Sequence, residues 1–146
     1  MRLITVCLLF SLLPAAAVTA QPGRGYALTT RLTRRLPAVD KVELEKYKTH
    51  EMRIESVEAT KTLEGGEARR VARLWRAQNY RPRDPMCHYP VFGIKFYSKG
   101  ALLLHASVCW ECDNIAFMTP RAKGRQGFNG RSAKGKELLG VFLKSF

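Results

Sequence analysis

Residues 87 to 112, CHYPVFGIKFYSKGALLLHASVCWEC, decide the fold because apolar and polar side chains alternate through most of the stretch. Alternation of this period predicts β-strands, and Gly100 marks a turn between two of them. A three-residue turn of Ser98, Lys99 and Gly100 puts the apolar residues of both strands on one face, whereas a two-residue turn would pair Phe96 with Leu103. The expected pairs are Phe96–Leu102, Ile94–Leu104 and Phe92–Ala106. The stretch therefore predicts a β-hairpin with a three-residue turn.

Three cysteines flank this hairpin, and its register brings them together. Cys87 becomes a diagonal neighbour of Cys109 and lies near the bend that contains Cys112. A disulfide from Cys87 to Cys109 or to Cys112 would close a loop of more than twenty residues and stabilise the fold by roughly 3 kcal/mol. This structural disulfide is the interpretation that we favour, because the chain also carries an export signal.

Two other chemistries stay open for the same cysteines. With His88, the three thiols would make a three-Cys, one-His zinc site, but adjacent residues on an extended strand point to opposite faces. Cys109 and Cys112 also form a C-x-x-C pair, for which Cys87 could be the resolving thiol. Residues 113–120 follow that pair and read as a short strand, not as the helix that usually stabilises such a thiolate. We therefore expect no cofactor, with zinc as the alternative.

The other patterns complete an α+β domain. Residues 41–47 and 51–59 alternate as strands do, while residues from 67 onward and residues 132–146 have the period of amphipathic helices, the second opened by Ser132. The apolar helix positions are Ala68, Val71, Ala72 and Trp75, then Leu138, Leu139 and Phe142. We predict an antiparallel sheet of four or five strands with one or two helices packed on one face, the core domain spanning residues 40–118. The C-terminal helix is expected to pack on that core, an interfacial membrane helix being the alternative.

The N-terminus has the features of a secretory signal peptide. Arg2 precedes an apolar run over residues 3–13 and a stretch of small residues that ends at Ala20. We expect cleavage after Ala20 and a periplasmic or secreted protein. The rest of the chain offers no apolar run of membrane-spanning length.

The chain is strongly basic, with a formal net charge of +13. Much of the excess lies in residues 21–39 and 119–131, which we predict to be flexible segments that precede the core and the C-terminal helix. The candidate anion-binding residues are Arg69, Arg73 and Arg76 on the first helix and Arg121, Lys123 and Arg125 in the second segment. Solvated surface charge is the alternative for both groups. Export makes nucleic acid an unlikely partner, so we expect an anionic envelope polymer, a lipid head group or an acidic protein.

The patterns CHYPVFGIKFY and SVCWECDNI resemble those of small exported or lipid-anchored bacterial proteins of uncharacterised function. The resemblance covers residues 63–118 and implies a location in the bacterial envelope and a shared cysteine cluster, but no activity or ligand.

Catalytic motifs are sparse: His105 lies about 13 Å along the strand from Cys109, too far for a Cys–His pair. The sequence thus favours a non-enzymatic binding protein for an anionic partner. A thiol-redox or zinc protein that uses the cysteine cluster is the alternative.

Overall fold

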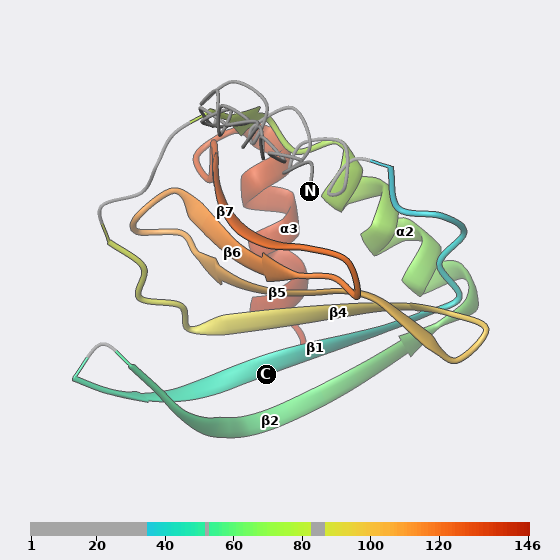
Figure 1. Ribbon diagram of the computed structural model, residues 1–146, viewed down its shortest axis with the longest axis horizontal. Helices are drawn as coiled ribbons and strands as arrows, with labels where there is room; N and C mark the ends of the chain where they lie inside the picture. Colours follow the sequence, from blue (N-terminus) through green and yellow to red (C-terminus); the bar gives the residue numbers. More distant parts are fainter. Residues whose placement is uncertain (1–34, 52, 83–86) are drawn as a thin grey trace, which may run out of the picture.

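A computed structural model describes residues 35–51, 53–82 and 87–146 of the chain. These residues form a seven-stranded antiparallel sheet, in the order β2-β1-β4-β5-β6-β7-β3, together with two helices (Figure 1). The elements are β1 (Lys41–His50), β2 (Arg53–Glu64), α2 (Gly65–Arg76), β3 (Tyr80–Arg81), β4 (Phe92–Ser98), β5 (Ala101–Cys109), β6 (Asn114–Met118), β7 (Lys123–Phe128) and α3 (Ala133–Leu143). The antiparallel sheet is confirmed.

The sheet is wider than the four or five strands that we predict. The two additional strands are β3 and β7, which pair with each other at one edge of the sheet. The prediction of a flexible loop over residues 119–131 is wrong for β7, whose other edge pairs with β6. The sequence of β7 shows no alternation of apolar and polar residues, because the apolar residue that it contributes to the core is Phe128, at the end of the strand. Short strands of this kind give little periodicity to recognise.

The hairpin of β4 and β5 exists, but its turn differs from the predicted one. Ser98 pairs with Ala101, so the turn has two residues, and both Lys99 (φ 48°) and Gly100 (φ 79°) are left-handed. Such a turn matches the twist of the strands better than a three-residue turn does. An irregularity in the ladder at Leu103 then restores the apolar faces, so Phe96 pairs with Leu104 instead of Leu102. The shared apolar face is thus correct, while the predicted pairs are shifted by two residues.

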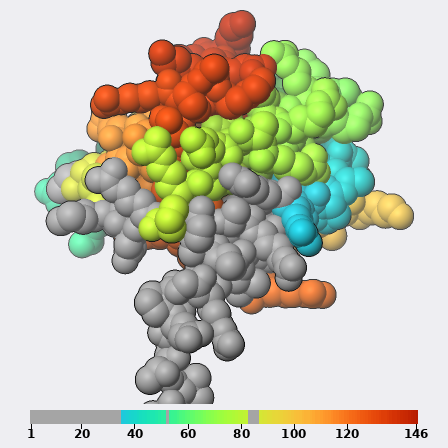
Figure 2. Space-filling model, turned by 90° about the horizontal axis from the view of Figure 1, so that it is seen from above, coloured from blue at the N-terminus to red at the C-terminus, as the bar shows by residue number. Residues whose placement is uncertain are grey.

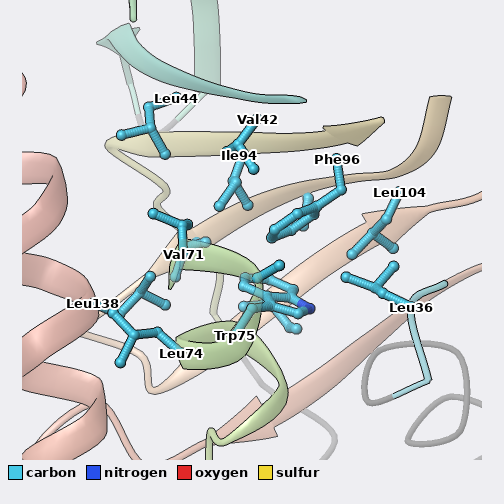
Figure 3. Close-up of a cluster of buried hydrophobic side chains, with 14 of the residues drawn as sticks. Leu36, Val42, Leu44, Val71, Leu74, Trp75, Ile94, Phe96, Leu104 and Leu138 are labelled. Atoms are coloured by element: carbon cyan, nitrogen blue, oxygen red, sulfur yellow. The ribbon is translucent and has the colours of Figure 1, made fainter. Parts of the chain in front are cut away.

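The core lies between the sheet and the helices. Trp75 of α2 packs against Phe96 of β4 with ring centroids 5.3 Å apart. Figure 3 shows Val71 facing Ile94, while Leu74 lies beside Leu138 of the C-terminal helix. Leu36 also belongs to this cluster. Leu36 falls in the predicted flexible segment 21–39, whose end therefore contributes to the core, while residues 21–34 lie outside the described residues.

The C-terminal helix α3 begins where the sequence predicts. The Ser132 hydroxyl accepts a hydrogen bond from the Gly135 amide at 3.0 Å, which caps the helix. Phe142 is fully buried, and its ring centroid lies 5.0 Å from that of Phe92. Figure 2 shows the surfaces of α3 and α2 next to each other, and Arg70 of α2 forms an ion pair with Glu137 of α3 at 3.7 Å. Both helices thus contact the face of β4 that carries Phe92 and Phe96, and no helix of the described residues lies on the opposite face.

Candidate functional site

The face of the sheet opposite α2 and α3 holds a pocket of about 450 Å³. Because side chains alternate along a strand, the residues between the core positions of β1, β5, β6 and β7 point to this face. The polar residues that line the pocket are Tyr47, His105, Ser107, Lys123 and Arg125. We call it the open-face pocket.

The open-face pocket combines an apolar wall with positive charge. Ile54 and Met118 are 44% and 53% exposed, and both line the pocket. Lys123 pairs with Met118 across the ladder, and Arg125 pairs with Ala116. Within the described ranges, neither cation forms an ion pair. Both charges are therefore free to meet a ligand.

A buried carboxylate organises one end of this face. Glu45 is only 2% exposed, and its Oε2 accepts hydrogen bonds from the Tyr47 hydroxyl at 2.9 Å and from His105 Nε2 at 2.9 Å. Lys95 forms an ion pair with Oε1. Burial opposes the ionised form of Glu45, but the hydrogen bonds from Lys95, Tyr47 and His105 outweigh it, so the pKa of Glu45 is lowered. Burial and the neighbouring carboxylate raise the pKa of Tyr47, which keeps its hydroxyl protonated.

A second polar network lies beside the pocket. His88 Nε2 is 2.8 Å from the Ser107 hydroxyl, and His88 Nδ1 contacts the side-chain oxygen of Asn114. Asn114 is completely buried, and its amide nitrogen donates to the carbonyl oxygens of Cys87 at 2.6 Å and Cys112 at 3.2 Å. Burial lowers the pKa of His88 against the opposing effect of its bond to Asn114, and the positive charge of Arg125 lowers it further.

The three predicted cysteines lie close together, and two of them form a disulfide. Cys87 is bonded to Cys112, one of the two pairings that we expect. Cys109 is a free, buried cysteine, whose sulfur accepts a hydrogen bond from the Cys112 amide at 3.2 Å. His88 does not join the sulfur atoms, since Ser107 and Asn114 hold its ring. Residues 35–51, 53–82 and 87–146 contain no group of His, Cys, Asp and Glu side chains arranged to hold a metal ion.

The predicted anion-binding residues divide into two groups. The Arg76 guanidinium donates to the carbonyl oxygens of Leu36 at 2.9 Å and Pro37 at 2.8 Å, so it fastens the segment before β1 to α2. Arg69 and Arg73 are exposed beside a smaller hollow of about 160 Å³ on α2.

The second group is divided by the start of β7 at Lys123. Lys123 and Arg125 line the open-face pocket, but Arg121 lies in the turn before the strand and is exposed outside the pocket.

Sequence reasoning missed four residues that organise this face: Glu45, Tyr47, Ser107 and Asn114. Glu45 and Tyr47 alternate with Val42 and Leu44 in the same predicted strand, so the pattern does show that they share the face opposite the core. The alternation does not predict that these two side chains are buried, because a polar residue on the outer face of a strand is usually solvated.

Comparisons with known proteins do not assign this site. The chain matches no protein-family model, no curated protein and no solved structure. Among the described residues, neither helix is both long and apolar enough to cross a bilayer.

Proposed function

We propose that this is an exported protein of the bacterial envelope that binds a small anionic amphiphile, such as a lipid head group with part of its chain, in the open-face pocket. The observation that carries the proposal is the meeting of Lys123 and Arg125 with the exposed apolar side chains of Ile54 and Met118 in one hollow. A cationic rim fits a phosphate or carboxylate, and the apolar wall fits the hydrocarbon next to it.

The position of the charges favours a compact ligand over a long polymer or an acidic protein. Lys123 and Arg125 are two residues apart on β7 and point to the same face, so their charges converge on one site. The cations of α2 project from the helix that covers the opposite face of the sheet. A single extended polyanion would therefore have to pass around an edge of the sheet to meet both groups.

Binding of octyl phosphate, measured by titration calorimetry and compared with octyl glucoside, tests the proposal. The two ligands share a chain, but only the first is anionic. We expect octyl phosphate to bind in a salt-sensitive manner and the double variant K123A/R125A to weaken it at least about tenfold, which corresponds to about 1.4 kcal/mol.

Arg121→Ala is the matched control because it removes a neighbouring surface charge that lies outside the pocket. It is expected to change the affinity less than twofold. Equal losses from R121A and R125A would show that general surface charge attracts the ligand, and the pocket would not be the site. Equal binding of octyl glucoside would remove the anionic part of the proposal.

A thiol-redox protein is a second candidate, and one contact favours it. The Cys109 sulfur lies 3.2 Å from the backbone nitrogen of Cys112, one of the two residues of the disulfide. Attack by the Cys109 thiolate on Cys112 would form a Cys109–Cys112 disulfide and release the Cys87 thiolate, with no external oxidant. Tryptic mapping of disulfides after incubation with glutathione buffers distinguishes the two pairings, and an unchanged Cys87–Cys112 bond would argue against this candidate.

Zinc binding would require reduction of the same disulfide, so zinc titration of the reduced protein tests that alternative.

A further inference from the structure

We propose that Ser107 is a nucleophile, activated by His88 and oriented through Asn114, and that it hydrolyses carboxylic esters bound in the open-face pocket. The inference rests on the proposed function only for the substrate's class, an acyl ester with an anionic group. The three side chains form the nucleophile, base and orienting group of a hydrolase, with Ser107 and His88 2.8 Å apart.

The hydrogen bonds of Asn114 fix the position of the His88 proton. Both partners of the Asn114 amide nitrogen are carbonyl oxygens, which only accept, so this end of the side chain must be the NH₂ group. The Asn114 oxygen therefore faces His88 Nδ1, and Nδ1 must carry the proton. Because burial favours the neutral ring, Nε2 is left with a lone pair directed at the Ser107 hydroxyl. This is the tautomer that a general base requires.

The disulfide supports this arrangement from the neighbouring residue. Cys87 precedes His88 and is bonded to Cys112, and the carbonyl oxygens of both cysteines accept from Asn114. The base and the group that orients it are thus tied to the same covalent link. These hydrogen bonds offset the cost of burying the Asn114 amide and hold it in one orientation.

The nucleophile is accessible from the pocket. Ser107 is half-buried and lines the open-face pocket together with Arg125, whose charge is close enough to His88 to affect its pKa. An ester carbonyl above Ser107 would have its developing oxyanion near this guanidinium. Arg125 therefore provides positive charge where negative charge appears in the reaction.

The chemistry balances without a further reactant except water. Ser107 Oγ attacks the carbonyl carbon, its proton moves to His88 Nε2, and the C–O bond to the alcohol breaks as His88 returns that proton to the leaving oxygen. Water then attacks the acyl-serine and gives one proton to His88, which passes it to Ser107 Oγ as the acyl bond breaks. The products are one carboxylic acid and one alcohol for each ester and water consumed.

A fluorophosphonate probe and 4-nitrophenyl butyrate, both without an anionic group, test the catalytic inference on the oxidised full chain from residue 21. We expect a single adduct by intact mass, located at Ser107 by peptide mapping. We also expect the rate of butyrate hydrolysis to fall at least about 100-fold in S107A and H88Q. Ser56→Ala, on the exposed surface of β2, should retain both the adduct and the rate.

Labelling of the wild-type protein does not depend on whether any variant folds. No adduct, an adduct elsewhere, or an S107A rate within threefold of wild type would overturn the inference. The outcome is separable from that of the binding proposal, because octyl phosphate contains no carboxylic ester. Binding of octyl phosphate without Ser107 labelling removes catalysis alone, while labelling without such binding removes the anionic ligand alone.

Discussion

The Tyr47 side chain lies directly over Gly93, so that a methyl group on this glycine would stand 1.8 Å from the tyrosine hydroxyl oxygen. Gly93 pairs with Glu45 on one neighbouring strand and with Ser107 on the other. The space above a single glycine thus lets Tyr47 reach from β1 across β4, where its hydroxyl meets Glu45 and lies 3.3 Å from His105. The absence of a side chain at this position shapes one wall of the open-face pocket.

Gly93→Ala is therefore expected to displace Tyr47 and destabilise the protein by about 1–3 kcal/mol, the usual cost of adding a methyl group to a packed site. The measurement is urea unfolding followed by tryptophan fluorescence. Gly66→Ala is the matched control, because nothing lies within 4 Å of a methyl group there and alanine favours a helix. A Gly93→Ala protein as stable as wild type would show that Tyr47 does not hold this position in solution.

Glu45 should make the stability depend on pH in the acid range. Its pKa in the folded protein is below the ordinary value of 4.5, so the unfolded chain binds the proton more readily. The stabilisation is complete above about pH 4.5 and is lost as pH falls through the folded pKa. Glu45→Gln should lose about 1–3 kcal/mol at pH 7, because Lys95 and His105 then face a neutral amide, and should show a smaller further loss between pH 5 and pH 3.

Glu58→Gln serves as the control for that comparison. Glu58 pairs with Lys46 at 3.1 Å, but its side chain is 50% exposed, and exposed pairs contribute little. This variant should follow the wild-type stability curve at each pH. If Glu45→Gln also follows the wild-type curve, the buried network contributes nothing to acid sensitivity.

The sequence predicts the fold best where side chains alternate on strands with one buried face. The strands around Val42 and Ile94, the helix of Trp75 and the strand after Cys112 all have the predicted type. The hairpin register is not predicted correctly, since the alternation is equally consistent with a three-residue turn and with a two-residue turn followed by an irregularity at Leu103. Lys99 and Gly100 both adopt the left-handed conformation that favours a two-residue turn, and this decides between the two turns.

The candidate site is predictable only in part, because it is built from contacts between distant strands. Convergence of the cysteines follows from the hairpin alone. The contact of His88 with Asn114 needs, in addition, the turn at residues 110–113, and the pocket needs β7, whose sequence lacks a strand period. The local excess of positive charge predicts Lys123 and Arg125 as anion-binding residues, but which of the neighbouring cations share a pocket depends on the pairing of that strand.

The disulfide predicts a specific count of thiols. Alkylation of the denatured, unreduced chain from residue 21 should modify one cysteine, Cys109, and alkylation after reduction should modify three. Cys87→Ser and Cys112→Ser should each destabilise the protein by about 3 kcal/mol, since both open the same loop.

Cys109→Ala, which leaves the bond intact, should cost less than either variant. Equal losses from Cys109→Ala and Cys112→Ser would instead indicate that the cysteines contribute through packing. Mass spectrometry of the alkylated protein and thermal unfolding provide the two measurements.

His88 should be neutral at pH 7, with its proton on Nδ1. Burial lowers its pKa below 6.5 in opposition to the hydrogen bond that His88 donates to Asn114, and the positive charge of Arg125 lowers it further. The unfolded chain therefore binds this proton more readily, so the free energy of unfolding should rise with pH through the range just below 6.5. Nitrogen-15 shifts of the ring, recorded against pH in the native state and in concentrated urea, measure the two pKa values, and Arg125→Ala should raise the native one. A native ring that titrates as in urea, or that carries its proton on Nε2, would contradict both the assigned tautomer and the role of His88 as a base toward Ser107.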